Sequence, residues 1–408
     1  YMTILHDSVW RANVQSKTVS VNEMPQSWRK LGGRALIARI LLDEDVAACD
    51  PMGPFNKLIW SVGLLVGHKV SSCDRISLGG KSPLTGGIKE SNAGGSTGLL
   101  LSHLGIRAFI LEGEPRSDQW QILRIDDKGG AFESAKDIVG LGVYDASEKL
   151  MQRYGNKVGI TLIGPGGEMG MYSAGVQNLD KDGVASRICA RGGLGAVMGA
   201  KRIKAIVIDA ANGEKPPLDS PSLFKAARKH YTEKLLAHPQ TKSFTDYGTA
   251  AMAAICNGFG ALPTRNFSQG QFEHVEAIGG ETMRELLLER GGDSDTSHAC
   301  MSGCIIRCSN CFASTTGELI VSPVEFETIG LVGSNLGIDN LDDILSVKGV
   351  DGIYIGPNDL GISLGAPLSV DVKNKFRSNE LPVSKETENA ISHILKVASN
   401  KNLITGIH

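Results

Sequence analysis

The stretch that most constrains the fold reads RISLGGKSPLTGGIKESNAGGSTG, at residues 75–98, and it holds seven glycines among small hydroxyl and basic side chains. Glycine permits positive φ and close approach of the backbone to a ligand. Exposed backbone amides, together with Arg75 and Lys81, suit a phosphate or a polar heterocycle. A turn-rich hairpin with a solvated face is the alternative, and this stretch alone does not choose between the two.

A second glycine loop reads ARGGLGAVMGAK, at residues 190–201. It resembles a dinucleotide-type loop but does not match G-x-G-x-x-G after a strand. Two anion-suited loops in one domain favour a phosphate-bearing cofactor more than either loop does alone.

Residues 1–212 are predicted to form a β-rich domain, because short apolar runs alternate with Gly and Pro turns. Gly contributes 50 of the 408 residues, well above the usual share of about 7%. No internal repeat is evident. Strands are expected at residues 57–62, 108–111, 120–125, 159–163 and 205–208, and helices at residues 31–42 and 145–154.

The composition changes after a linker-like segment at residues 212–219. Helical spacing at residues 220–238, 245–256 and 282–288 predicts a partial helical domain over residues 220–345. Residues 346–408 have a βα character, with a strand at 350–356 and a helix at 386–398. The predicted fold class is therefore α+β: a β-rich N-terminal domain, an incomplete helical domain and a short α/β tail.

Charge and hydropathy exclude several partners. The formal net charge is -2, with 41% hydrophobic and 21% charged residues, so no basic footprint for nucleic acid is present. There is no apolar run of about 18 residues, so no membrane helix is expected. The first residues, 1–7, lack the basic and then apolar pattern of a signal peptide, so a cytoplasmic location without a disulfide framework is expected. One residue precedes Met2, which suggests an extended or partial reading frame.

Four of the eight cysteines lie within twelve residues: Cys300, Cys304, Cys308 and Cys311. Thiolates suit iron–sulfur clusters or zinc, and these spacings fit either one stripe of a helix or a wrapping loop. Buried thiols and zinc stay as alternatives, but the intervening residues are polar and zinc sites usually use separated pairs. An iron–sulfur cluster is favoured. The other cysteines are isolated and are interpreted as free thiols: Cys49, Cys73, Cys189 and Cys256.

Further motifs give a family resemblance over about residues 28–344. They are LGGR at 31–34, KSPLTGG at 81–87, SNAGG at 91–95, GPGGE at 164–168, residues 191–201, ALPTRNF at 261–267, the cysteine cluster and EFETIG at 325–330. Together they resemble the aldehyde ferredoxin oxidoreductase family. The resemblance implies a cofactor of two pterins around tungsten or molybdenum, bridged through phosphates and magnesium, so residues 1–212 become a pterin-binding domain.

The resemblance also implies the cofactor contacts. Arg75, Asn92 and Arg191 are expected to converge on one cavity, since an arginine fork binds phosphate in bidentate fashion. The full set of candidate contacts is Arg75, Lys81, Ser82, Asn92, Gly94, Gly95, Arg191, Gly192 and Gly193.

A [4Fe–4S] cluster held by three close cysteines and one distant cysteine is implied as well. Cys300, Cys304 and Cys308 fit the close three, although C-x₃-C-x₃-C has one residue more in its first gap than the commonest family version. The distant ligand would lie beyond this chain. Cys311 is extra, and either it or an outside thiol is expected to complete the site.

The implied activity is oxidation of a small aldehyde to a carboxylic acid, with electrons passing through the cluster to ferredoxin or a similar carrier. Glu325 and Glu327 are both candidates for proton transfer, with a helix-surface carboxylate as the alternative for either. The metal, the aldehyde and the carrier stay open, and so does a homo-oligomer.

The tail introduces a second resemblance. GVDGIYIGPNDL, at residues 349–360, resembles a late strand and loop of HpcH/HpaI class II aldolases, which are (β/α)₈ barrels. Asp359 matches a metal ligand of that family, yet most strands are absent and no barrel can close. The tail is therefore expected to lack an aldolase site. A fusion or assembly error near residue 345 is one explanation, and a pyruvate aldolase remnant fused to a redox-enzyme fragment is the alternative function.

Overall fold

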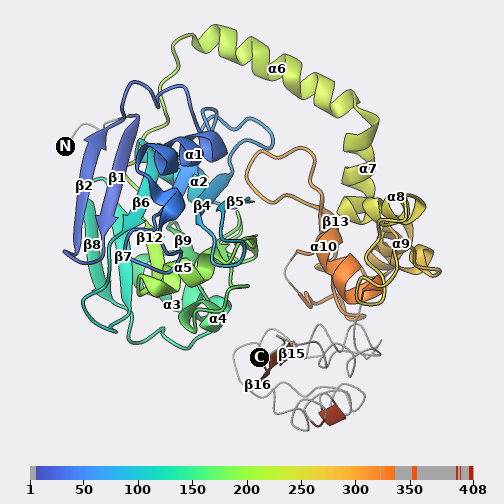
Figure 1. Ribbon diagram of the computed structural model, residues 1–408. Coiled ribbons are helices and arrows are strands. Elements are labelled where there is room, and N and C mark those ends of the chain that lie inside the picture. Colours follow the sequence, from blue (N-terminus) through green and yellow to red (C-terminus); the bar gives the residue numbers. More distant parts are fainter. Residues whose placement is uncertain are drawn as a thin grey trace. The chain divides into compact units, whose positions relative to one another are not determined.

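The computed structural model describes residues 6–321, 323–335, 352–355, 392–393, 396 and 404–407. It divides the chain into two compact units (Figure 1). The first unit comprises Tyr1–Lys234 and Cys300–Ile305, and the second comprises Leu235–Ala299 and Ile306–His408. The change from one unit to the other falls within helix α6 (Pro221–Ala237), later than the linker-like segment at residues 212–219.

Two six-stranded mixed sheets form the first unit (Figure 1). The first sheet has the order β2-β1-β6-β3-β4-β5 and the second the order β11-β10-β9-β12-β7-β8. The first sheet contains β1 (Ser8–Asn13), β2 (Thr18–Glu23), β3 (Leu58–Val62), β4 (Ile76–Lys81), β5 (Ile88–Ala93) and β6 (Ile106–Glu112). The second contains β7 (Gln121–Asp126), β8 (Gly129–Ser134), β9 (Gly159–Leu162), β10 (Val176–Asn178), β11 (Arg187–Cys189) and β12 (Ile203–Ile208).

The two sheets repeat one topology. In the first sheet only β1 and β6 pair in parallel, and in the second only β7 and β12 do; the other neighbours are antiparallel. The main helices occupy equivalent places: α1 (Gly33–Asp43) and α3 (Val143–Tyr154) follow the first hairpins, while α2 (Thr97–His103) and α5 (Leu194–Ala200) precede the last strands. The described residues thus contain a structural repeat that the sequence did not reveal.

One core joins the two sheets. Trp60 of β3 and Phe109 of β6 are almost fully buried and meet edge to face, with ring centroids 6.0 Å apart. They share a cluster with Ile206 of β12. The Trp60 Nε1 donates a hydrogen bond to the Thr161 Oγ1 of β9 at 3.4 Å. Because successive strand residues face opposite sides, the same strands also supply two outer cores.

The outer faces of the sheets are covered by helices. Leu36 and Ile40 of α1 pack on Ile59 and Ile110 of the first sheet. On the second sheet, residues of α3, with Leu150 among them, pack on β9 and β12. The remaining short helices of the first unit are a 3-10 turn η1 (Val46–Ala48) and α4 (Pro165–Glu168).

The second unit is mainly helical in its described part, with one small hairpin and one parallel pair of short strands. The sequence predicted a single helix at residues 245–256, and this was wrong. The chain instead breaks at Gly248, which adopts φ +62 and is approached by the Asn310 side chain. The elements are α7 (Pro239–Tyr247), η2 (Gly248–Ala251), α8 (Met252–Gly258), η3 (Val275–Ile278), α9 (Gly280–Arg290), β13 (Asp295–His298), β14 (Ser309–Cys311), α10 (Phe326–Thr328) and a π-helical turn η4 (Ile329–Ser334).

In the tail, β15 (Gly352–Ile355) pairs in parallel with β16 (Ile404–Ile407). The strand predicted at residues 350–356 is thus present. Asp359 lies outside the described residues, as does most of the helix predicted at 386–398.

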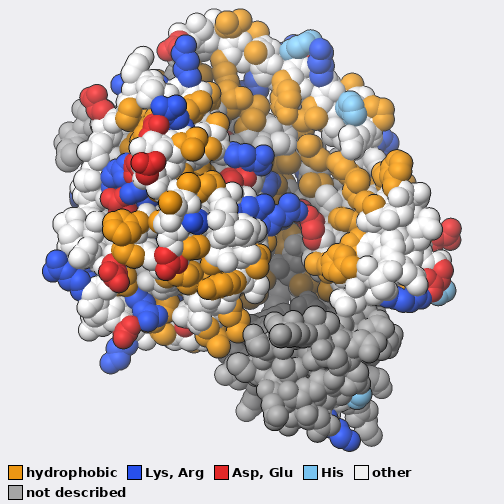
Figure 2. All heavy atoms as spheres, viewed as in Figure 1, with side chains coloured by type: hydrophobic (Ala, Val, Ile, Leu, Met, Phe, Trp, Pro, Cys, Tyr) orange, Lys and Arg blue, Asp and Glu red, His pale blue; other side chains and the backbone are white. Residues whose placement is uncertain are grey.

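The surface of the first unit is mixed in charge. On the face drawn in Figure 2, basic and acidic side chains are interspersed with apolar ones, as the net charge of -2 would suggest. None of the described helices combines the length and the hydropathy needed to cross a membrane. These sheets, helices and turns confirm the predicted α+β class.

Candidate functional site

The turn between β5 and α2 carries the first glycine pair. Gly95 adopts φ +101, a conformation that L side chains rarely adopt, and a Cβ there would overlap the Leu179 carbonyl oxygen. A Cβ on Gly94 would lie 2.9 Å from the Cys300 carbonyl oxygen. The Gly95 amide donates to that same Cys300 oxygen at 2.9 Å. Glycine is therefore needed at both positions: at Gly94 because the Cys300 segment lies against it, and at Gly95 because of its positive φ and the close Leu179 carbonyl oxygen.

The second glycine pair occupies the equivalent turn between β11 and α5. Gly192 and Gly193 adopt φ +86 and +67. The Ser82 Oγ donates to the Gly192 carbonyl oxygen at 2.6 Å, and the Arg191 amide donates to the Ser91 Oγ at 3.1 Å. The two glycine stretches of the sequence are thus brought together, although they lie about a hundred residues apart.

Arg75 links the first glycine stretch to the cysteines. Its Nε donates to the Asn92 Oδ1, and its Nη1 lies 3.6 Å from the Cys300 Sγ. The Asn92 amide in turn donates to the Ser77 Oγ at 3.2 Å. Lys81 is engaged elsewhere, since its Nζ donates to the Ala47 carbonyl oxygen at 2.7 Å. Convergence of Arg75, Asn92 and Arg191 on one cavity stays a prediction.

Cys300 and Cys304 form a buried thiol pair in the first unit. Their exposed fractions are 7% and 8%, and a hydrogen bond joins the two thiols. That hydrogen bond and burial raise the pKa of the Cys300 thiol far above its usual range, although the charges of Arg75 and Arg187 act in the opposite direction. A metal would have to displace the thiol proton, and the two guanidinium groups would stabilise the resulting thiolate.

The other two clustered cysteines belong to the second unit. The Cys308 carbonyl oxygen accepts a hydrogen bond from the Thr249 amide at 3.0 Å, and Cys311 pairs with Asp295 in the β13–β14 hairpin. The segment from Cys300 to Cys308 is a loop, so the single helical stripe allowed by the spacing does not form. Shared ligation by Cys300, Cys304, Cys308 and Cys311 stays a prediction.

The two candidate glutamates differ in environment. Glu325 precedes α10 and is half-buried, and its Oε1 accepts a hydrogen bond from the Ser309 Oγ at 2.7 Å. Glu327 is exposed within α10. The surface-carboxylate interpretation fits the exposed Glu327 better than the half-buried Glu325, and a role in proton transfer stays a prediction.

Two features went unrecognised in the sequence. Arg187, buried on β11, acts on the Cys300 thiol but belongs to no motif. Within the ALPTRNF motif, three consecutive residues adopt left-handed φ: Arg265 (46), Asn266 (56) and Phe267 (60). Such strain often marks functional segments. Here the Phe267 amide is held by a 2.7 Å hydrogen bond to the Asn335 Oδ1.

The fold is of the α+β class, with two sheets of the same topology. Each sheet contributes one glycine turn before a short helix, and the Cys300–Cys304 pair lies beside the first of these turns. Two family models match the sequence: "Aldehyde ferredoxin oxidoreductase, N-terminal domain" at residues 9–210 and "Aldehyde ferredoxin oxidoreductase, domains 2 & 3" at residues 226–350. The chain belongs to the aldehyde ferredoxin oxidoreductase family.

A curated relative and a solved structure support the assignment. A tungsten-containing aldehyde ferredoxin oxidoreductase of Thermococcus kodakarensis is 32% identical, over 96% of this chain and 64% of that protein. The chain therefore spans less than two thirds of that relative. The active-site complex BamBC of benzoyl coenzyme A reductase shares the fold, with a TM-score of 0.61 and 18% identity over 97% of this chain and 60% of that chain.

The tail matches a second family. The model "HpcH/HpaI aldolase/citrate lyase" covers residues 305–407. A 2-keto-3-deoxy-L-rhamnonate aldolase of Escherichia coli O1:K1 is 58% identical over 36 residues, which are 9% of this chain and 14% of that enzyme. Both predicted resemblances are confirmed, and the second is short.

Proposed function

We propose that this chain carries part of an aldehyde oxidoreductase, with a tungsten–pterin cofactor and a [4Fe–4S] cluster whose electrons pass to ferredoxin or a similar carrier. Tungsten is preferred to molybdenum because the T. kodakarensis relative is named as tungsten-containing. The observation that carries the proposal is the position of Arg75, which contacts both Asn92 of the glycine stretch and the Cys300 thiol.

The glycine turns fit a cofactor with two similar halves. Gly94–Gly95 and Gly192–Gly193 occupy equivalent places in the repeated topology, each before a short helix. Backbone amides in such turns suit phosphate groups. We propose that each turn would hold one pterin, that Arg75 and Arg191 would pair with its phosphate groups, and that magnesium would offset the remaining phosphate charge.

The cysteine segment fits the proposed cluster in its donor chemistry. Thiolates hold iron–sulfur clusters, and Cys300 and Cys304 are already paired beside Arg75 and Arg187. We propose Cys308 as a third ligand, and Cys311 or a thiol outside the chain as the fourth. Positive charge next to the sulfurs favours the reduced state, because it stabilises the added electron.

The metal–pterin group, when bound, supplies the two-electron redox chemistry. Conversion of an aldehyde and water to a carboxylic acid releases two electrons and two protons. Glu325 is proposed to take up a proton through its carboxylate, which the hydrogen bond from Ser309 keeps oriented. Arg75 is proposed to position the cofactor and to hold positive charge between it and the cluster.

The test uses the full chain produced with iron, sulfide and tungstate under anaerobic conditions. We expect a brown protein that contains iron, sulfide and tungsten. Arg75→Met should make the cluster harder to reduce, whereas Arg75→Lys should retain much of the wild-type potential because the charge remains. Arg153→Met, which removes an arginine paired with Asp137 on the outer helix α3, is the matched control. A colourless protein without iron or tungsten would overturn the proposal.

The aldolase match of residues 305–407 favours one alternative, a class II pyruvate aldolase activity. We expect none, because a barrel site needs ligands from several strand ends. The assay is aldol cleavage releasing pyruvate, with added magnesium or manganese. Turnover that Asp359→Ala abolishes would establish the alternative and overturn our expectation for the tail.

A further inference from the structure

The first unit contains a cavity of about 340 Å³ at the far end of α5 from the second glycine pair. Three turns line it: residues 52–54, residues 113–118 after β6, and residues 200–202 after α5. α5 has seven residues, so about 10 Å of helix separates this cavity from Gly193. The cavity is thus distinct from the proposed cofactor turns.

Lys201 is the buried cation of this cavity. It is 2% exposed, and its Nζ donates to the carbonyl oxygen of Gly113, another lining residue, at 3.1 Å. An ammonium has three donors, yet no carboxylate in the described part of the chain lies within ion-pair distance of it. A buried ammonium without a counter-ion is unusual, because burial of an unpaired charge is costly.

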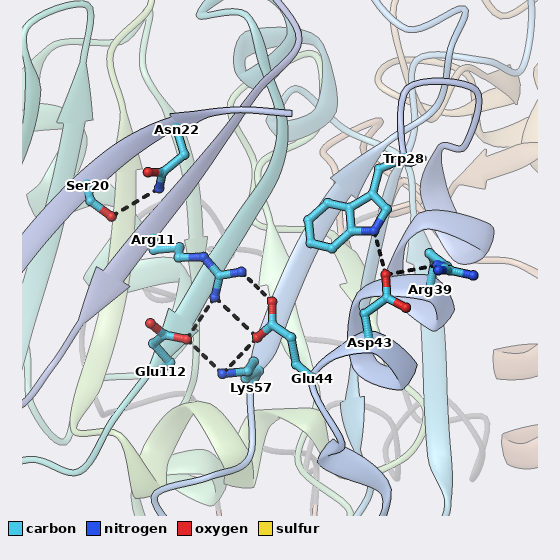
Figure 3. Close-up of polar contacts among 9 residues, drawn as sticks. All are labelled: Arg11, Ser20, Asn22, Trp28, Arg39, Asp43, Glu44, Lys57 and Glu112. Atoms are coloured by element: carbon cyan, nitrogen blue, oxygen red, sulfur yellow. Dashed lines mark hydrogen bonds and ion pairs between the residues drawn. The ribbon is translucent and has the colours of Figure 1, made fainter. Parts of the chain in front are cut away.

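Figure 3 shows that the carboxylates of Glu112 and Glu44 are already engaged by other cations. Glu112 pairs with Arg11 at 3.1 Å and with Lys57 at 2.9 Å, and Glu44 pairs with the same two cations. Two cations and two carboxylates already balance within this network. Lys201 lies close to it and is left with an unbalanced positive charge.

The remaining charges of the lining are also uneven. Asp118 pairs with Arg202 at 2.7 Å, and the Arg202 guanidinium lies over the Trp120 ring, 5.2 Å from its centroid. Arg116 is exposed and has no ion-pair partner among the described residues. Together with Glu114, the lining carries three cations and two carboxylates when Lys201 is protonated. Its net charge of +1 matches a ligand with one negative charge.

We propose that this cavity binds a small monocarboxylate, with its carboxylate held between the Lys201 ammonium and the Arg116 guanidinium. A singly charged ligand completes the charge balance, whereas a phosphate dianion would leave one negative charge without a partner in the lining. Charge-assisted hydrogen bonds from a buried ammonium are strong.

The pKa of Lys201 gives the site a pH signature. Burial and the charge of Lys57 lower this pKa from 10.5 to about 8, while Glu112, Cys49 and Glu114 act in the opposite direction. A bound carboxylate favours the ammonium and raises the pKa again. Binding should therefore take up a proton above pH 8, and the affinity should fall about tenfold per pH unit as the pH rises further.

The experiment is calorimetric titration of the full chain with benzoate and with acetate, with inorganic phosphate as the contrasting probe. At pH 9 the heats should depend on the ionisation enthalpy of the buffer, which reports proton uptake. Lys201→Met should weaken binding about tenfold or more and abolish that dependence. Arg116→Ala should weaken it about threefold while the proton uptake remains. The exposed lysine Lys136 lies outside the lining, so Lys136→Met is the matched control.

Three outcomes would overturn the proposal: no carboxylate binding, tighter binding of phosphate than of benzoate, or binding to Arg116→Ala and Lys201→Met with wild-type affinity. If Lys201→Met does not fold, Arg116→Ala and the proton uptake of the wild-type chain still decide the matter. None of these readouts depends on tungsten, iron or aldehyde turnover, so failure here is distinguishable from failure of the proposed redox function.

Discussion

Gly95→Ala should destabilise the first unit far more than the same change at Gly86. Both glycines have positive φ, +101 at Gly95 and +70 at Gly86, and an L residue in that region costs about 1–2 kcal/mol. Nothing lies within 4 Å of a Cβ built on Gly86, whereas one on Gly95 would overlap the Leu179 carbonyl oxygen. Forcing a methyl group into such a packed site adds about 1–3 kcal/mol. We therefore expect a total loss of about 2–5 kcal/mol for Gly95→Ala.

Urea unfolding followed by tryptophan fluorescence measures both variants, since Trp60 is buried in the shared core. The loss at Gly86 should be about 1 kcal/mol, because alanine also restricts the unfolded chain and offsets part of the strain. The Gly95 amide bonds to the Cys300 carbonyl oxygen, so the bound iron of the reconstituted variant should fall as well. Equal destabilisation by the two alanines would refute the argument that close approach, rather than φ alone, requires glycine at position 95.

Other predictions concern buried charge and the thiols. Lys204→Met leaves Glu168 without its ion-pair partner and should lower the free energy of unfolding by about 3–5 kcal/mol. The double variant with Glu168→Gln should recover part of that free energy in urea unfolding. No recovery would contradict the ion-paired role of Lys204. The native pKa of Lys201 lies at about 8, below the ordinary value of 10.5. The unfolded state therefore binds more protons between pH 8 and pH 10.5, so the free energy of unfolding should rise with pH across this window by about 3 kcal/mol. Lys201→Met should flatten that rise, and an unchanged profile would exclude Lys201 as its source. Cys304→Ser should lower the iron bound on reconstitution whereas Cys256→Ser should not, and equal iron in both would count against ligation by Cys304.

Local patterns in the sequence predicted many elements closely. The apolar run at residues 57–62 became β3, and the helical spacing at residues 220–238 became α6. Such patterns work because alternation and capping act over a few residues. The helix predicted at residues 245–256 is broken at Gly248, which has a positive φ and packs against Asn310, some sixty residues later in the chain. Contacts of that kind are not visible in local periodicity.

In the candidate site, too, local sequence patterns were predictable and long-range contacts were not. Glycine content marked both turns, but only the fold shows that they are equivalent, because equivalence lies in strand order and not in shared residues. Arg187 could not be found from a motif, since it gains its role only when β11 places it near Cys300. The sequence also left open whether the cysteine segment was a helix or a loop. The segment forms a loop, and its Cys300 carbonyl oxygen accepts a hydrogen bond from the Gly95 amide. Local spacing of the cysteines cannot show a contact between residues so far apart in the sequence.

The repeated topology of the first unit is consistent with an origin by gene duplication and fusion. Two identical chains, each with a single sheet of this kind, could associate about a two-fold axis and bury the same core between them. Duplication and fusion of such a gene would then join the two copies covalently, with the turn at residues 113–118 as the connection. Once the copies were joined, each could change alone. The cysteine segment packs on the Gly94–Gly95 turn, and a cluster bound there, as proposed, would lie beside one half of the repeat.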